Sequence, residues 1–244
     1  MVDPLEDLVA SSRELGRPEA GYVILGEGNT SLIRDAQAFW VKASGGHLRT
    51  ADATAFVAVR FAPLLELLDS PEQDVAPEQR AFDAAVCAGT GRPSSEAALH
   101  ALALSLGGAR AAAHTHPTAL MGILCSPYAR RAAEGRLFPD EVLVCGRASA
   151  FVPYTQPGLP LARAFRTALH EFHEQWGEPP RVVLLENHGL LTLGQDPAET
   201  VRITAVCVKA AHVLRDSLVL GGPRFLSSEA VEQLAAYRRA RRPA

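Results

Sequence analysis

A run of small apolar residues, Ala111-Ala112-Ala113, leads directly into His114-Thr115-His116 and is followed by Pro117. The apolar run predicts a buried β-strand, in which alternate side chains point to the same face. The imidazoles of His114 and His116 can therefore reach one point in space. Any fold of this chain has to accommodate two histidines side by side at the end of a core strand.

A third histidine, His188, lies much further along the chain in Glu186-Asn187-His188-Gly189. Three neutral histidines leave a divalent cation its full positive charge and an open coordination position. That arrangement is typical of catalytic metal sites rather than structural ones. Histidines at a strand end can also be hydrogen-bonded polar residues with no further role, so the other polar segments have to be considered.

The composition indicates an ordinary globular protein. The 244 residues are 48% hydrophobic and 21% charged, which suits a single domain over residues 1–244. A net charge of −3 gives no electrostatic footprint for a nucleic-acid partner. The one basic run, Arg238-Arg239-Ala240-Arg241-Arg242, is interpreted as a solvated tail.

The chain shows no targeting or membrane signal. No apolar stretch is long enough to cross a bilayer, and the first residues lack the basic and apolar regions of a signal peptide. None of the four cysteines forms a CxxC motif, so all four are interpreted as buried free thiols. We therefore expect a cytoplasmic protein without a membrane partner.

Hydrophobic periodicity predicts the elements along the chain. Helices are expected at 3–16, 61–69, 95–106, 117–125, 160–175, 197–218 and 228–239, with a loop at 70–80. Besides the histidine strand, strands are expected at 22–25, 31–34, 39–43, 56–60, 141–144, 150–153, 181–187 and 190–193. Strands in two runs with helices between and after them predict an α/β (α+β) sandwich around one largely antiparallel sheet.

Two polar segments near the N-terminus could bind an anion. The backbone amides of Gly26-Glu27-Gly28-Asn29-Thr30-Ser31 could form an anion-binding nest, although a plain connecting turn explains the segment equally well. Lys42-Ala43-Ser44-Gly45-Gly46 combines a lysine, a hydroxyl and two glycines, which suits a phosphate. Ser-Gly-Gly is also a common flexible turn.

A third polar segment, Pro93-Ser94-Ser95-Glu96, begins a predicted helix. The free N–H groups and the dipole of a helix start favour an anion. Ser94 as an N-cap and Glu96 in the first turn would also stabilise the helix without any function.

Together and in this order, five motifs resemble the class II aldolase/adducin family. They are Gly28-Asn29-Thr30-Ser31, Lys42-Ala43-Ser44-Gly45, Pro93-Ser94-Ser95-Glu96, His114-Thr115-His116 and Asn187-His188-Gly189. The family includes fuculose- and rhamnulose-phosphate aldolases, ribulose-phosphate 4-epimerases and methylthioribulose-1-phosphate dehydratases. The resemblance spans residues 5–218. It implies a three-layer sandwich, with helices on both faces of a mainly antiparallel nine-stranded sheet, and commonly a homotetramer.

The resemblance also implies roles for individual residues. His114, His116 and His188 would bind a divalent metal, usually zinc. Glu96 would lie beside it as acid and base, with a role as ligand in the empty site as the alternative. The residues implied to surround a substrate phosphate are Gly28, Asn29, Ser44, Gly45, Ser94 and Ser95.

The reaction implied by the resemblance is aldol cleavage or condensation of a ketose phosphate. It passes through a metal-stabilised enediolate and yields dihydroxyacetone phosphate and an aldehyde. A methylthioribulose-1-phosphate dehydratase-like or pentulose-phosphate 4-epimerase-like enzyme is the alternative, and a non-catalytic adducin-like scaffold is a further one. Glu96 weighs against the epimerase, which typically has Asp there, and the intact histidines weigh against the scaffold.

One catalytic role stays open at this point. In well-known aldolases and epimerases of the family, a tyrosine from a neighbouring subunit donates a proton. Tyr128, Tyr154 and Tyr237 are the candidates in this chain, and the resemblance assigns none of them.

Overall fold

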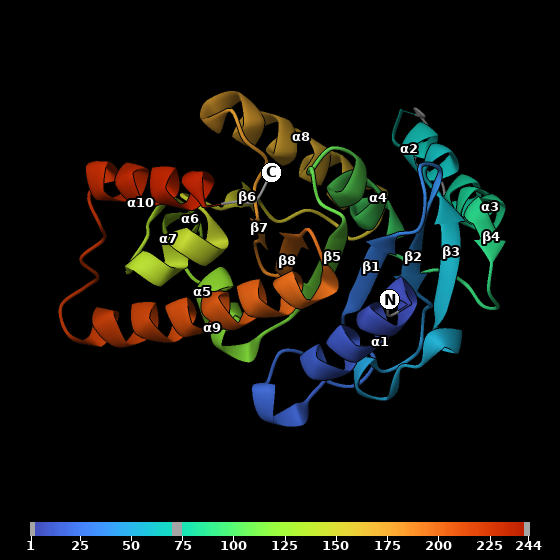
Figure 1. The fold of residues 1–244 in the computed structure, drawn as a ribbon, viewed down its shortest axis with the longest axis horizontal. Helices are drawn as coiled ribbons and strands as arrows, with labels where there is room; N and C mark the ends of the chain where they lie inside the picture. The colour runs from blue at the N-terminus through green and yellow to red at the C-terminus, as the bar shows by residue number, and fades with distance from the viewer. Residues whose placement is uncertain (1–2, 70–74, 242–244) are drawn as a thin grey trace.

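The computed structural model describes residues 3–69 and 75–241, and its centre is an eight-stranded sheet (Figure 1). The strands are β1 (Asn29–Ile33), β2 (Ala38–Lys42), β3 (Phe56–Arg60), β4 (Val86–Ala88), β5 (Ala111–Thr115), β6 (Ala150–Val152), β7 (Val182–Leu185) and β8 (Gly189–Gly194). Their order is β4-β3-β2-β1-β5-β8-β7-β6. Neighbouring strands are antiparallel except for β6 and β7, which are parallel.

Helices cover both faces of the sheet, as the resemblance implies. The helices are α1 (Pro4–Leu15), α2 (Phe61–Asp69), α3 (Val75–Ala85), α4 (Ala97–Ser105), α5 (Thr118–Leu124), α6 (Ala129–Glu134), α7 (Pro139–Cys145), α8 (Leu159–Trp176), α9 (Pro197–Val219) and α10 (Ser228–Ala240). Short 3-10 helices lie at Pro18–Ala20, Leu48–Thr50 and Ala53–Ala55. Helices α1 and α9 pack on one face and α2, α4 and α8 on the other (Figure 1).

The alternation of side chains along β5 directs the histidines to one layer. Ala112 belongs to the core cluster shared with α4 and α8, whereas Ala111 and Ala113 pack on the α1 side. His114 follows Ala112 by two residues and therefore points toward the α4 layer. The same strand periodicity that builds the core thus places this imidazole beside the start of α4.

Two predicted strands are wrong. Residues 22–25 form a turn rather than a strand, with Ile24 and Leu25 exposed and Leu25 at a φ of 50°. Residues 141–144 lie in α7, where Pro139 occupies the first turn and Asp140 and Glu141 face the positive end of the helix dipole. These helix-start signals outweigh the β-branched residues of the run.

Other expectations differ in part. Residues 75–80 of the predicted loop are helical in α3, and 70–74 lie outside the described residues. Cys145 and Cys207 are buried, but Cys87 and Cys125 are exposed, so the prediction of four buried thiols is wrong for these two. Within the described residues, no helix combines the length and apolarity that a membrane span needs.

Candidate metal centre

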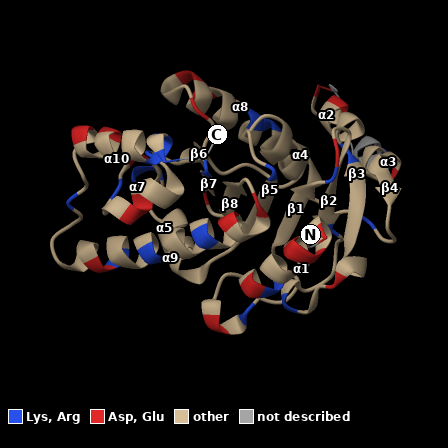
Figure 2. Ribbon diagram, viewed as in Figure 1, with Lys and Arg blue, Asp and Glu red and all other residues tan. Residues whose placement is uncertain are grey.

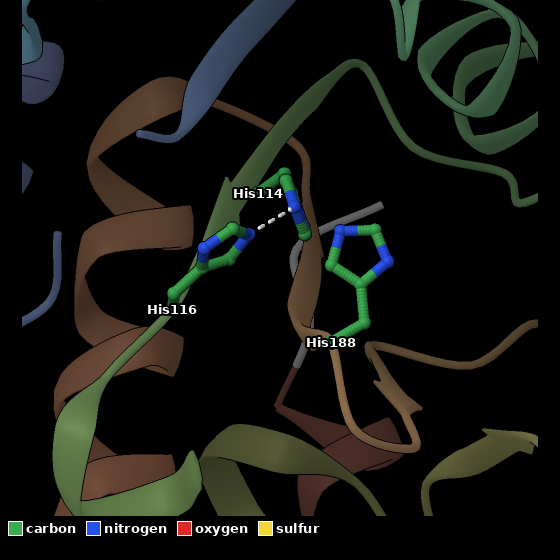
Figure 3. A group of neighbouring side chains, drawn as sticks. All are labelled: His114, His116 and His188. Carbon is green, nitrogen blue, oxygen red and sulfur yellow. Dashed lines mark hydrogen bonds between the residues drawn. The ribbon is translucent and has the colours of Figure 1, made fainter. Parts of the chain in front are cut away.

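The three histidines converge from two neighbouring strands (Figure 3). His114 lies in β5 and His116 just after it, while His188 lies in the turn between β7 and β8. Because β5 pairs with β8, this turn is adjacent to the end of β5. One ring nitrogen of each histidine lies within 4.8 Å of those of the other two. The predicted convergence of the three imidazoles is therefore present in the fold.

The backbone of the β7–β8 turn is adapted to this closeness. Asn187 has a φ of 54°, in the left-handed region that asparagine tolerates better than most residues. A Cβ at Gly189 would lie 2.7 Å from the Thr115 carbonyl oxygen and 2.7 Å from the ring of His116. The Asn-His-Gly sequence thus suits a turn that is pressed against the end of β5.

Hydrogen bonds set the orientation of His114. Its Nδ1 donates to the Leu190 carbonyl oxygen at 3.0 Å, because a carbonyl can only accept. In the neutral ring, Nε2 then carries the lone pair, and it lies 2.8 Å from Nε2 of His116. Two nitrogen atoms facing each other in this way fit a shared cation, and zinc takes such ligands at about 2.0–2.1 Å.

Glu96 lies beside the triad at the start of α4. Its Oε1 is 3.3 Å from His114 Nε2 and 3.0 Å from His188 Nε2, and its side chain is 14% exposed. Burial raises the pKa of this carboxyl, but the charge of His114 and hydrogen bonds from His114, His188 and Asn29 outweigh it, so the pKa is lowered. A carboxylate therefore lies within reach of anything bound at the histidines.

The histidines respond differently to this carboxylate. Burial lowers the pKa of His114, but the neighbouring Glu96 outweighs it and the pKa is raised. Burial and the charge of His114 lower the pKa of His116 to about 4. His116 is therefore neutral at pH 7, and an imidazole binds a cation only through an unprotonated ring nitrogen.

A buried chain of hydrogen bonds holds Glu96 from behind. Asn29 Nδ2 donates to Glu96 Oε2 at 2.8 Å. His100 Nε2 donates to Asn29 Oδ1, and Ser31 Oγ donates to His100 Nδ1 at 2.5 Å. Burial lowers the pKa of His100 to about 3, which keeps its ring in the neutral form that this pattern requires. Sequence reasoning left His100 without a role.

A second carboxylate lies beside the triad, next to His116. Glu27 Oε1 lies 3.5 Å from His116 Nδ1, and Glu27 Oε2 accepts a hydrogen bond from the backbone N–H of Ile24 at 3.0 Å. The Glu27 side chain is 35% exposed. Glu27 therefore lies behind a candidate ligand, where a carboxylate can orient an imidazole. Sequence reasoning considered only the amides of this turn.

The predicted phosphate-binding segments lie together. Ala43 and Pro93 form an isolated antiparallel bridge, and the backbone N–H of Ser44 donates to the Arg92 carbonyl oxygen at 2.9 Å. A Cβ built at Gly26 would be 3.9 Å from the Gly45 carbonyl oxygen. The three loops that the sequence singled out are therefore neighbours.

The candidate residues on these loops have different surroundings. Gly28 is closely packed, since a Cβ there would lie 2.9 Å from the His114 carbonyl oxygen, whereas Gly45 faces open space. Ser94 Oγ accepts from the backbone N–H of Glu96 at 3.2 Å, and Ser95 is exposed. Lys42 Nζ is buried and donates to the Gly46 carbonyl oxygen at 2.6 Å, so it fastens the loop that it precedes.

The candidate tyrosines lie on three different segments. Tyr154 is exposed, and its backbone N–H donates to Glu186 in the turn that carries His188. Tyr128 precedes α6, and Tyr237 lies in α10. Among these three tyrosines, Tyr154 is thus attached to a segment of the histidine centre.

The fold and the site define this chain as a mixed α/β protein with three histidines that could hold a metal at the end of a mainly antiparallel sheet. The sequence profile of the Class II Aldolase and Adducin N-terminal domain matches residues 6–214. The chain therefore belongs to the class II aldolase and adducin family.

Solved structures share this fold. L-fuculose 1-phosphate aldolase has a TM-score of 0.72 at 20% identity, covering 98% of this chain and 97% of that chain. The N-terminal class II aldolase domain of a conserved protein from Thermoplasma acidophilum has a TM-score of 0.68 at 22% identity, covering 87% of this chain and 94% of that chain. YgbL of Klebsiella pneumoniae, described as aldolase, epimerase or decarboxylase, has a TM-score of 0.70 at 21% identity, covering 95% of this chain and 97% of that chain. Identities this low show the fold alone.

A curated relative is longer than this chain. The Bacillus subtilis (strain 168) protein named uncharacterized oxidoreductase YuxG is 26% identical over 238 residues, which cover 91% of this chain and 32% of that protein. The chain thus spans about a third of the length of this relative.

Proposed function

We propose that this chain is a metal-dependent enzyme that cleaves or forms a carbon–carbon bond of a ketose phosphate by aldol chemistry. The products of cleavage would be dihydroxyacetone phosphate and an aldehyde. The main support is the position of the Glu96 carboxylate, within 3.3 Å of two of three converging imidazoles. Family membership gives the second line of support.

His114, His116 and His188 would hold a divalent cation, which we propose to be zinc. When bound, this cation supplies positive charge that stabilises the negative charge developing on a substrate oxygen. The hydrogen bond from His114 Nδ1 to Leu190 keeps the other ring nitrogen directed at the site. The neutral state of His116 removes one proton that a cation would otherwise have to displace.

Glu96 would transfer the proton at the reacting substrate carbon. Its Oε2 is held by Asn29, which leaves Oε1 on the side of the histidines. A base held at one position does not have to be reoriented during the reaction, which lowers the barrier to proton transfer. We propose that Asn29 and His100 act as positioning residues for this carboxylate.

The substrate phosphate would bind at the three neighbouring loops. The residues proposed to surround it are Gly28, Asn29, Ser44, Gly45, Ser94 and Ser95, as the resemblance implies. Open space above Gly45 and the exposed hydroxyl of Ser95 support this position. Binding at a distance from the reacting carbons would fix their register at the histidines.

Related reactions use the same residues and remain alternatives within the proposal. A dehydratase or a pentulose-phosphate 4-epimerase would need the same cation and carboxylate but would break a different bond. A glutamate at position 96 favours the aldolase over the epimerase by resemblance. The donor of a proton to the leaving alkoxide is unassigned, and the backbone of Tyr154 is hydrogen-bonded to Glu186 in the His188 turn.

We further propose that residues 1–244 form one domain of a cytoplasmic homotetramer. The four free cysteines support a reducing compartment. The exposed side chains of Ile24 and Leu25, close to the histidine centre, support burial by another subunit. Light scattering on the purified protein measures the subunit number directly.

The reaction is tested by incubating the zinc-loaded protein with a panel of ketose 1-phosphates and measuring release of dihydroxyacetone phosphate. We expect release from at least one substrate and its loss with a chelator. Glu96→Gln should keep the metal and lose release, whereas Glu174→Gln, an exposed glutamate on α8, should change neither. Loss of substrate without dihydroxyacetone phosphate would indicate dehydration or epimerisation instead, and no turnover of any substrate would contradict the proposal.

A further inference from the structure

A cleft of about 350 Å³ opens between α7, α9 and α10, and none of its lining residues belongs to the histidine centre. Arg181 before β7, Arg202 on α9 and Arg238 and Arg241 at the end of α10 line it, together with Tyr237. Figure 2 shows this concentration of basic residues at the C-terminal end of α10. The cleft has the size of a small-molecule site.

The sequence suggested a different place for these arginines. Arg238 and Arg241 belong to the basic run that was interpreted as a solvated tail. In the structure the run lies at the end of α10, which packs on α7; Arg241 is exposed, and both residues line one cleft with Arg181 and Arg202. Residue 242 lies outside the described residues. Two segments that are far apart in the sequence therefore contribute positive charge to one cavity.

Positive charge dominates the cleft although the chain is acidic overall. Among the described residues that line it, four are arginines and one, Glu199, is an acid. Glu199 pairs with Arg181. Arg202 reaches Asp196 only at 4.0 Å, and both side chains are more than half exposed, so this pair contributes little. An anion entering the cleft would therefore meet positive charge, although the chain as a whole has a net charge of −3.

The groups in the cleft are suited to oxyanions in particular. The guanidinium of arginine presents a planar fork of N–H donors that matches phosphate and carboxylate groups. Nε of Arg181 is buried and has no hydrogen-bond partner in the described structure. Arg241 lies over the ring of Tyr237, with its Cζ 4.7 Å from the ring centre. This contact holds the guanidinium group of Arg241 in place before an anion binds.

We propose that this cleft is a binding site for a small polyanion that carries at least two phosphate or carboxylate groups. Four arginines from three separate elements provide more N–H donors than one such group can accept from. The site is separate from the histidine centre and does not depend on the proposed aldol chemistry.

The proposal is tested by calorimetric titration of the full chain with pyrophosphate and, separately, with citrate at matched ionic strength. We expect saturable binding of at least one of them, and the comparison identifies phosphate or carboxylate as the preferred group. The Arg202→Gln/Arg241→Gln double variant should bind at least tenfold more weakly. Arg215→Gln removes one positive charge from an exposed position on α9 outside the cleft and should bind within twofold of the unchanged protein.

A second measurement locates the bound probe. Methyl resonances of Leu143 and Val144, which line the cleft, should shift on addition of the probe in the unchanged protein and not in the double variant. Absence of binding by both probes would overturn the proposal. Equal binding by the double variant, or shifts confined to residues of the histidine centre, would overturn it as well, because the probe would then occupy another site.

Discussion

The two carboxylates that flank the histidines are held in very different ways. Glu96 is 14% exposed and is tied through Asn29 and His100 to a buried strand. Glu27 is 35% exposed and is tied to the backbone of a turn whose tip, Ile24 and Leu25, faces outward. The buried flank is preorganised by hydrogen bonds from neutral side chains in the core, whereas the outer flank is partly exposed. We infer that chemistry depends on the first and metal affinity is adjusted by the second.

The largest effect is expected from removing one of the three candidate metal ligands. His188→Ala leaves only two imidazoles. Changing a residue that merely orients a metal ligand can lower the metal affinity up to roughly hundredfold, so removing a ligand itself should lower it by more than that. Activity should disappear with the metal. Metal content after dialysis measures this, with His173→Ala on the surface of α8 as the matched control. Full metal content in His188→Ala would show that another set of residues binds the cation.

The buried flank is tested directly by Glu96→Gln. Glutamine keeps the size of the side chain but cannot take up a proton, so kcat should fall roughly 10²- to 10⁴-fold while KM changes little. Metal content should stay at the level of the unchanged protein. A loss of metal with a proportionate loss of activity would instead identify Glu96 as a ligand only.

The support behind Glu96 is tested by His100→Phe. This change leaves Asn29 Oδ1 buried without its donor, which should lower the free energy of unfolding by about 1–3 kcal/mol and lower kcat together. Denaturant unfolding and steady-state kinetics measure the two effects, with the exposed His170→Phe as control. Lower stability with unchanged kcat would restrict His100 to a structural role.

The outer flank should give a smaller change. Glu27→Gln removes the charge behind His116, and metal affinity should fall about tenfold, at the lower end of such effects because Glu27 is partly exposed. Competition with a chelating dye measures the affinity. Glu19→Gln, a more exposed glutamate, should have no effect. An equal loss in both variants would mean that general surface charge, not the contact with His116, sets the affinity.

The smallest effect concerns pH. The pKa of His100 is about 3 in the fold and about 6.5 when unfolded, so between these values the unfolded chain binds more protons. This contribution to stability is present above pH 6.5 and is lost as the pH falls toward 3. From pH 7 to 5.5 the loss should be about 1 kcal/mol. His100→Phe should lack this part of the acid sensitivity, and identical pH profiles would contradict it.

Local patterns predicted most of the fold. The helical periodicity of 197–218 and 160–175 identified α9 and α8 nearly to the residue, because long amphipathic segments leave few alternatives. The short apolar runs at 22–25 and 141–144 were ambiguous, since periodicity alone does not separate strand, helix and turn. At 141–144 the preceding proline and acidic residues were the available signal for a helix.

The site was predictable in outline but not in its supports. The spacing of His114 and His116 predicted that these two imidazoles converge, and the resemblance carried by the five motifs implied that the histidines, Glu96 and the loops form one site. The partnership of His100 with Asn29, by contrast, joins residues 71 positions apart through packing. Nothing local distinguishes such a histidine from others on a helix. The basic cleft depends in the same way on how α10 folds back.

A crystal structure of the zinc-soaked protein, with anomalous diffraction measured at the zinc edge, tests the central claim most directly. Our interpretation predicts one strong peak per chain, at about 2.0–2.1 Å from one ring nitrogen each of His114, His116 and His188. A peak bound by only two of these histidines, or placed elsewhere while the triad keeps its direct hydrogen bonds, would contradict it.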